Sequence, residues 1–195
     1  MRFLFFILIF ALIFGVAPIY ADTQTRNPIT DEAVSGTWTG SVGTRFTVVD
    51  DYPDTAGTDE LVHGTTTAGN LTFTAVPFVV PLDATSISVS VKYYDYKNGS
   101  QSASIAGRLK VSGSYFASAA HNPTNGAANR TQRTNTWATN PNTAAAWTPL
   151  EVNAIQAFGW VATDVNPSIA LSSVQLEVTY TPASNFQEFL LRRIN

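Results

Sequence analysis

The sequence predicts an all-β protein, an antiparallel β-sandwich of jelly-roll type with one short helix, and three observations predict this class. At least six runs alternate apolar and polar residues with the period of two that half-buried strands require. Gly, Pro, Asn and Asp residues separate these runs and favour turns. One capping box, Thr148-Pro149-Leu150-Glu151, predicts a helix over residues 149–156.

The N-terminal segment has the pattern of a secretory signal peptide over residues 1–21. Arg2 precedes an unbroken apolar run over residues 3–16, and the small residue Ala21 closes the segment. An uncleaved membrane anchor is the alternative, because the apolar stretch extended to Ile19 nears spanning length. No later segment approaches that length, so we expect a secreted or cell-surface protein without membrane contact after cleavage.

The rest of the chain has the length of one domain. We expect a polar, flexible leader over residues 22–35, a sandwich domain over residues 36–182 and a C-terminal tail over residues 183–195. The sequence contains no cysteine, so burial alone must stabilise an exported domain.

The charge of the chain excludes one class of partner. Removal of Arg2 with the signal peptide changes the formal net charge from −3 to −4, and the few basic residues form no continuous run. A nucleic-acid partner is therefore not expected.

The first half of the sandwich is predicted from two alternating runs, over residues 44–49 and 71–76, with an acidic loop over residues 50–69 between them. Residues 86–111 then predict a β-hairpin.

The register of this hairpin depends on its turn. A two-residue turn would place the two apolar faces on opposite sides, whereas a three-residue loop aligns them. We therefore predict a three-residue loop with Gly99 in the left-handed conformation and with Val91 opposite Ile105.

The second half contains a long connecting loop over residues 117–136, rich in Ala, Asn, Thr and Gly, and strands over residues 157–163 and 170–180. In the last strand the alternation predicts which side chains face the core. These are Val174, Leu176, Val178 and Tyr180, with Ser173, Gln175, Glu177 and Thr179 facing outward.

Catalytic chemistry finds little support in the sequence. His63 and His121 are the only neutral-pH bases, and no Gly-x-Ser-x-Gly elbow is present. Glycoside hydrolysis needs two carboxylates, but Glu177 stands alone on its strand and Glu151 is explained by capping. We expect a non-enzymatic protein, the alternative being a polysaccharide-active enzyme with a pocket built from distant residues.

The acidic loop offers hard oxygen ligands that calcium prefers. Its spacing does not match the twelve-residue helix-loop-helix calcium motif, and a solvated acidic loop is the alternative to a structural calcium ion. No other cofactor is expected. The candidate ligands are Asp50, Asp51, Asp54, Asp59 and the adjacent Glu60.

Two further surfaces are candidates for binding. Tyr94 and Tyr96 lie on the face opposite Val91 and could stack on sugar rings, or they could pack beneath the 117–136 loop. The C-terminal tail is either a short amphipathic cover for the sandwich or a peptide that docks on a neighbouring subunit. Its candidate assembly residues are Phe186, Phe189 and Leu190.

Three sequence elements carry a resemblance to known proteins. They are Trp-x-x-Asn-Pro at residues 137–141, Ala-Trp-Thr at residues 146–148 and Val-x-Leu-Glu-Val-Thr-Tyr at residues 174–180. Together with the strand pattern of residues 44–182, the chain resembles β-sandwich modules of phage and prophage structural proteins and of bacterial surface proteins. This resemblance implies a non-catalytic structural or recognition module, and the signal peptide favours export by a cell over a virion location.

These observations lead to one leading hypothesis and three alternatives. We expect a secreted, non-enzymatic sandwich that acts in cell-surface structure or adhesion. The alternatives are a carbohydrate-binding module with a surface polysaccharide as partner, a subunit of an extracellular or virion-like assembly that self-associates through its tail, and the polysaccharide-active enzyme described above.

Overall fold

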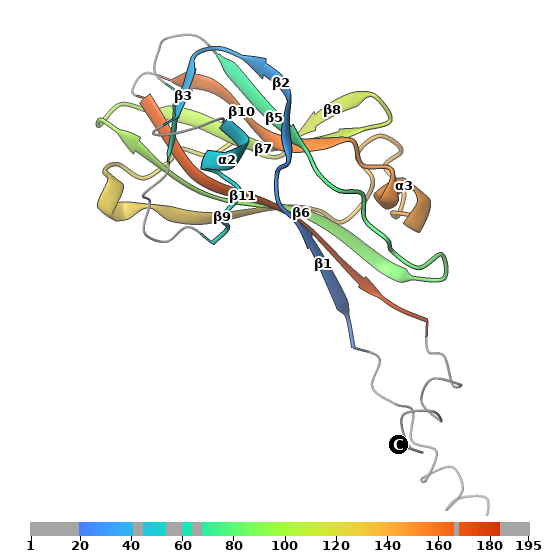
Figure 1. Cartoon of the computed structure of the whole chain (residues 1–195). Coiled ribbons are helices and arrows are strands. Elements are labelled where there is room, and N and C mark those ends of the chain that lie inside the picture. Colours follow the sequence, from blue (N-terminus) through green and yellow to red (C-terminus); the bar gives the residue numbers. More distant parts are fainter. Residues whose placement is uncertain (1–19, 41–44, 54–59, 64–67, 166–167, 184–195) are drawn as a thin grey trace, which may run out of the picture.

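The computed structural model describes residues 20–40, 45–53, 60–63, 68–165 and 168–183, which form two antiparallel sheets packed face to face (Figure 1). The predicted all-β sandwich is therefore confirmed. The first sheet contains β1 (Asp22–Arg26), β3 (Trp38–Gly40), β4 (Leu61–His63), β6 (Thr85–Asn98), β9 (Thr131–Trp137) and β11 (Ser168–Thr181). The second contains β2 (Thr30–Ser35), β5 (Gly69–Thr74), β7 (Ala103–Val111), β8 (Ser114–Ala117) and β10 (Ala157–Val165).

We call the first sheet A and the second sheet B. The strand order in sheet A is β3-β4-β11-β6-β9, with β1 pairing with β11, and the order in sheet B is β2-β5-β10-β7-β8. From β4 to β11 the chain changes sheet at every connection except the one between β7 and β8. This alternation is typical of a jelly roll.

The predicted hairpin over residues 86–111 is wrong, because its two strands lie in different sheets. Val91 pairs with Leu176 and Asn135 in sheet A, whereas Ile105 pairs with Ala162 in sheet B. The apolar faces of β6 and β7 meet across the core, and alternation alone does not distinguish this arrangement from edge-to-edge pairing. Gly99 does have a positive φ, 138°, in the crossover between the sheets.

Two segments expected to be irregular are strands, and one expected strand is helical. Most of residues 22–35 form β1 and β2 instead of a flexible leader, and the predicted 117–136 loop ends in β9 and begins at the last residue of β8, Ala117. These edge strands carry many polar residues, because backbone pairing can order an edge without a continuous apolar face. Residues 45–48 form a single helical turn, α2 (Arg45–Val48), rather than a strand.

The second helix, α3 (Pro149–Asn153), begins as the capping box predicts. Thr148 Oγ1 accepts a hydrogen bond from the Glu151 amide at 3.3 Å, and Glu151 Oε2 accepts one from the Thr148 amide at 2.9 Å. The helix ends at Asn153, before the expected residue 156. Next to the cap, Trp147 Nε1 donates to the Trp137 carbonyl oxygen at 2.9 Å, which joins this helix to the end of β9.

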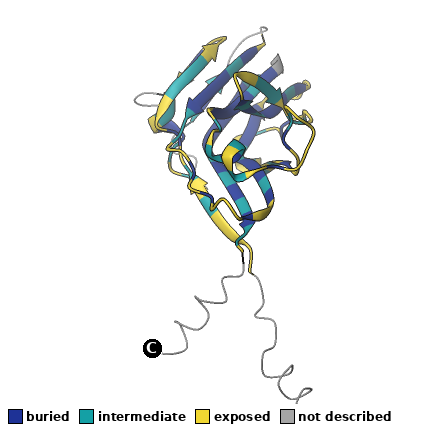
Figure 2. Ribbon diagram, turned by 90° about the vertical axis from the view of Figure 1, so that its right-hand side faces the viewer, coloured by how far each residue is buried: buried dark blue, intermediate teal, exposed yellow. Residues whose placement is uncertain are grey.

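The core lies between the sheets and surrounds Trp160, which is fully buried on β10. Its indole lies edge-on to the rings of Phe73 and Tyr93, at centroid distances of 5.7 and 6.0 Å, and so contacts both layers. Figure 2 shows the buried residues inside the sandwich and the exposed ones at its edges and loops. The predicted inward side chains of β11 are all buried, but Ser173, predicted to face outward, is buried as well.

The two ends of the described chain leave the sandwich together, because β1 pairs with the last part of β11 (Figure 1). Phe186, Phe189 and Leu190 lie outside the described residues, so the predicted assembly tail stays a prediction. No helix within the described ranges has the length and apolar composition needed to cross a membrane.

Gly159 on β10 provides a test of the packing in sheet B. A Cβ at this position would lie 2.1 Å from the Leu71 carbonyl oxygen, a contact that only a backbone shift in β5 could relieve. We expect Gly159→Ala to reduce the free energy of unfolding by ~3 kcal/mol in denaturant titrations. Gly113→Ala is the control, because its Cβ would meet no atom within 4 Å and only its φ of 83° is unfavourable, which costs about 1 kcal/mol. Equal losses in the two variants would contradict the described packing.

Candidate functional site

The outer face of sheet B is concave. Glu32 lies on edge strand β2 and Tyr115 on the opposite edge strand β8, yet the Tyr115 hydroxyl donates to Glu32 Oε2 at 2.5 Å. In a flat sheet these strands would lie about 19 Å apart, since neighbouring strands are spaced about 4.8 Å apart. That separation exceeds the combined reach of the two side chains, so the sheet must curl until its edges approach each other. Figure 1 shows β2 and β8 on the same upper side of the molecule, away from β6 and β9.

The carboxylate of Glu32 connects the two edges of the curved sheet. Glu32 occupies an irregularity in the pairing of β2 with β5, between Asp31 and Ala33. Its Oε1 accepts from Lys110 Nζ on β7 at 2.5 Å, and its Oε2 accepts from Thr72 Oγ1 on β5 at 2.8 Å as well as from Tyr115. Four of the five strands of sheet B therefore meet at Glu32.

Arg108 completes the group of polar side chains on this face. Its guanidinium carbon lies 4.0 Å from the centre of the Tyr115 ring, and its Nη1 donates to Asn70 Oδ1 at 2.7 Å. Asn70 is on β5, so the arginine must cross β10, where its neighbour Gly159 has no side chain to obstruct it. We call this group the outer cluster: Glu32, Asn70, Thr72, Arg108, Lys110 and Tyr115.

The outer cluster is half-buried, and its contacts and burial shift the pKa values of its charged side chains. Desolvation favours the neutral form of Glu32, but the hydrogen bonds from Lys110, Tyr115 and Thr72 outweigh it and hold the pKa of Glu32 below its ordinary value. The hydrogen bond to Glu32 raises the pKa of Lys110, and desolvation lowers the pKa of Arg108. Glu32 and Lys110 are therefore a charged pair at neutral pH, and Arg108 adds a second cation.

The sequence prediction placed a sugar-binding surface on sheet A instead, at Tyr94 and Tyr96. The structure buries Tyr96 to 5% exposure, where its hydroxyl donates to Glu60 Oε2 at 2.7 Å and the Arg130 guanidinium lies 5.3 Å from its ring centre. Tyr96 therefore offers no open ring, because an ion pair at the edge of the sheet covers it.

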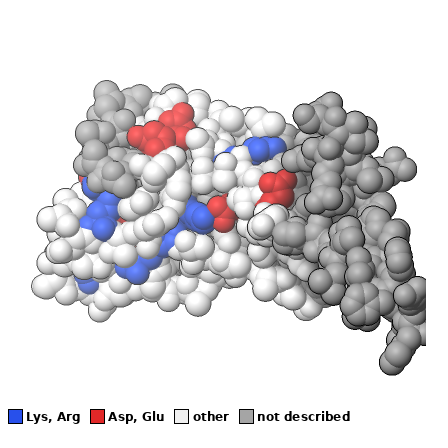
Figure 3. Space-filling view, turned by 90° about the horizontal axis from the view of Figure 1, so that it is seen from below, with Lys and Arg blue, Asp and Glu red and all other residues white. Residues whose placement is uncertain are grey.

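Tyr94 is half-exposed and stays a candidate. Its ring is 5.7 Å from that of Tyr52, at an angle of 44°, and Gln132 donates to the Tyr52 hydroxyl. The ion pair between Lys92 and Glu177, at 2.6 Å, lies on the same outer face of sheet A. Figure 3 views the molecule from this side and shows charges of both signs scattered over a mostly uncharged surface.

The predicted calcium ligands are only partly described. Asp50 and Asp51 lie in the segment after α2, whereas Asp54 and Asp59 lie outside the described residues. Glu60 contacts Tyr96 and Arg130. Within the described ranges no three His, Asp or Glu side chains are grouped as metal ligands would be, so the calcium site stays a prediction.

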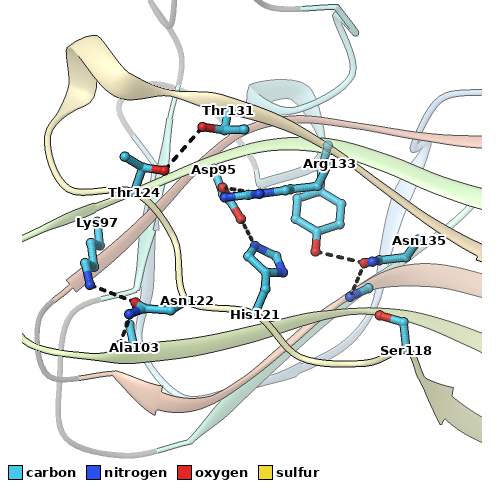
Figure 4. A network of polar contacts seen from close by, with 12 residues as sticks. Asp95, Lys97, Ala103, Ser118, His121, Asn122, Thr124, Thr131, Arg133 and Asn135 are labelled. Atoms are coloured by element: carbon cyan, nitrogen blue, oxygen red, sulfur yellow. Dashed lines mark hydrogen bonds and ion pairs between the residues drawn. The ribbon is translucent and has the colours of Figure 1, made fainter.

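The two histidines of the chain both have structural surroundings. His63 is fully buried, with Nδ1 2.8 Å from the Thr37 carbonyl oxygen and its ring stacked on Trp38 at 4.5 Å. His121 contacts the buried carboxylate of Asp95, which also accepts from Arg133 Nε at 3.1 Å (Figure 4). These contacts account for both side chains without a substrate.

The segment over residues 118–126, which carries His121, joins the two sheets at one edge of the sandwich. The Ile105 amide of sheet B donates to the His121 carbonyl oxygen at 3.0 Å, and the Lys97 amide of sheet A donates to that of Thr124 at 2.9 Å. Figure 4 shows this segment passing between the strands. The sandwich beneath the outer cluster is therefore tied together by backbone hydrogen bonds as well as by its core.

Sequence reasoning missed the outer cluster for identifiable reasons. Glu32 lay in the expected leader, and Tyr115 lay just after the predicted hairpin, which ends at Val111. Arg108 and Lys110 did carry a signal, because they alternate with the buried Leu109 and Val111 and must face outward together. No local pattern shows, however, that the sheet curls and brings them to Glu32.

The lowered pKa of Glu32 predicts a pH dependence. A carboxylate whose pKa is depressed on folding stabilises the protein fully above its ordinary value, 4.5, and this contribution is lost as the pH falls through the folded-state pKa. We expect Glu32→Gln to reduce the free energy of unfolding by about 1 kcal/mol at pH 7 and by less as the pH falls below 4.5. Urea unfolding at a series of pH values measures this. Glu177→Gln is the control. The Glu177 carboxylate accepts a hydrogen bond from one donor, Lys92, whereas the Glu32 carboxylate accepts from three, so the control should show a smaller effect. A pH-independent loss in Glu32→Gln would contradict the prediction.

Comparison with known proteins identifies no family. No family model and no curated protein matches the chain. Among solved structures, it is similar to the C-terminal family 6 carbohydrate-binding module of a marine laminarinase from Zobellia galactanivorans, with a TM-score of 0.47, 10% identity, and coverage of 81% of this chain and 99% of that one. It is also similar to a family 22 xylan-binding domain from Paenibacillus barcinonensis, with a TM-score of 0.46, 13% identity, and coverage of 86% and 100%.

A third similar structure is a family 11 carbohydrate-binding module from Clostridium thermocellum in complex with a β-1,3-1,4-mixed-linked tetrasaccharide. The TM-score is 0.35 and the identity 9%, over 83% of this chain and 91% of that one. These structural neighbours are carbohydrate-binding modules. The resemblance to phage and prophage structural proteins stays a prediction.

Proposed function

We propose that this chain is a secreted, non-enzymatic β-sandwich that binds polysaccharide through the concave outer face of sheet B. The observation that carries this proposal is the contact between Glu32 and Tyr115, which requires the two edges of sheet B to approach each other. A concave face contacts more of a bound chain than a flat one does, and therefore buries more of its surface.

The chemistry of the outer cluster suits sugar hydroxyls. Arg108, Lys110 and Asn70 offer several donors, and Asn70 also offers an amide oxygen as acceptor. Contacts with Glu32 and Tyr115 hold these side chains in place before a ligand arrives, which lowers the entropic cost of binding. Binding, rather than hydrolysis, is favoured because the cluster holds one carboxylate and hydrolysis of a glycoside needs two.

A second surface competes with this one. Tyr52 and Tyr94 present two half-exposed rings beside Gln132 on the outer face of sheet A, and aromatic rings stack well on the apolar faces of sugars. The two surfaces belong to opposite sheets, so single substitutions can distinguish them.

The test is affinity electrophoresis of the protein, without residues 1–21, in gels that contain xylan, laminarin or polygalacturonate. For a polymer that retards the parent protein, we expect Tyr115→Ala to weaken binding by about tenfold or more, since it removes the group that positions both Glu32 and Arg108. Tyr94→Ala is the matched control on the opposite face and should change the affinity by about twofold or less.

Two further measurements make the outcome decisive. Thermal unfolding shows whether each variant is folded, and Tyr115→Phe, which keeps the ring but removes the hydroxyl, should weaken binding by an intermediate amount. Loss of binding in Tyr94→Ala with normal binding in Tyr115→Ala would contradict the proposal and assign the sugar to sheet A. Absence of retardation by every polymer would also contradict it.

A further inference from the structure

We infer that the outer cluster binds the oxyanion of an acidic polysaccharide, a carboxylate or a sulfate ester, and that Arg108 is the residue that contacts it. This inference rests on the proposed function, which requires only that the face binds a polysaccharide, and it adds the chemical class of the ligand.

The charges of the outer cluster do not balance. Glu32 is its one carboxylate, and both of its oxygens are occupied by Lys110, Thr72 and Tyr115. Arg108 therefore adds a positive charge that no carboxylate in the cluster contacts. A ligand with one negative charge would neutralise the site.

Three of the four other arginines in the described ranges contact a carboxylate, and the fourth, Arg26, uses more of its N–H groups than Arg108 does. Arg45 contacts Asp31 at 2.7 Å, and the carboxylates of Glu60 and Asp95 contact Arg130 and Arg133. Arg26 has no carboxylate contact, but its guanidinium donates to backbone carbonyls and to Gln24 with Nε and both Nη atoms. Arg108 makes one hydrogen bond, to Asn70, although a guanidinium has five N–H groups.

The geometry holds the free N–H groups in position. Stacking on Tyr115 fixes the plane of the guanidinium, and the bond to Asn70 fixes its direction across Gly159. A planar fork of this kind matches the two oxygens of a carboxylate or sulfate. Lys110, whose ammonium lies 5.1 Å from the same ring centre, adds a second cation nearby.

General electrostatic attraction does not account for such binding. The chain without residues 1–21 has a formal net charge of −4, so the molecule as a whole repels a polyanion. Affinity for an acidic polymer would therefore have to come from a local site such as this one.

The experiment compares polymers that differ in charge and share a backbone. Isothermal titration is carried out with polygalacturonate and its fully methyl-esterified form for the carboxylate, and with dextran sulfate and dextran for the sulfate. We expect the parent protein to bind at least one acidic polymer about tenfold or more tightly than its neutral counterpart. Preference for polygalacturonate identifies a carboxylate ligand, and preference for dextran sulfate identifies a sulfate.

The variants assign the preference to Arg108. Arg108→Gln keeps a polar side chain but removes the charge and the guanidinium fork, and it should abolish the difference between the acidic and neutral polymers. Arg108→Lys keeps the charge but not the fork, so an intermediate preference is expected. Arg130→Gln is the matched control, since Arg130 also lies over a tyrosine ring but is paired with Glu60, and it should leave the preference unchanged.

The results separate this inference from the proposed function. Equal binding of acidic and neutral polymers that is still lost in Tyr115→Ala would overturn the inference and keep the proposed function. Acidic preference that is unchanged in Arg108→Gln would also overturn the inference. Absence of binding to every polymer, in a protein shown to be folded by its thermal transition, would overturn both.

Discussion

The concave face of sheet B depends on one carboxylate. Glu32 takes hydrogen bonds from Thr72, Lys110 and Tyr115, on three different strands, and a half-buried carboxylate is stable only with such partners. Because these donors come from strands that a flat sheet would keep far apart, satisfying the charge requires curvature. The curvature in turn gathers side chains from both edges of the sheet over its middle strand, where Gly159 leaves room for Arg108. The shape of the face and its chemistry thus have a common origin.

The rest of the described molecule supports this face through its apolar core and through backbone hydrogen bonds between the sheets. Trp160 belongs to β10, the strand that Arg108 crosses, and packs into the core on the opposite face of that strand. Residues 118–126 join the two sheets by backbone hydrogen bonds at one edge. Other buried titratable groups, among them His63, Asp95 and Lys97, are engaged with protein partners. A site on such a scaffold keeps its geometry without a ligand, and binding then costs little in side-chain ordering.

The sequence predicted local features better than the arrangement of strands. The capping box at Thr148 and the alternation of Val174, Leu176 and Val178 depend on neighbours in the chain, and the structure confirms both. The hairpin at Gly99 was predicted wrongly because alternating strands can pair edge to edge or pack face to face, and only tertiary packing decides between them. The outer cluster could be predicted only as far as Arg108 and Lys110 facing outward together. Glu32, the carboxylate of the cluster, lies on a polar edge strand 76 residues before Arg108. The curvature that brings the two together has no local sequence signal.

The most direct measurement of the central claim is backbone amide chemical-shift mapping by NMR during titration with an oligosaccharide of the bound polymer. If the concave face of sheet B is the binding surface, the largest shifts will fall on Asn70, Arg108 and Tyr115 and on the strand that carries Gly159, while Tyr94 and Gln132 on sheet A stay unchanged. Shifts concentrated at Tyr94, Gln132 and their neighbours, with the outer cluster unaffected, would contradict the account.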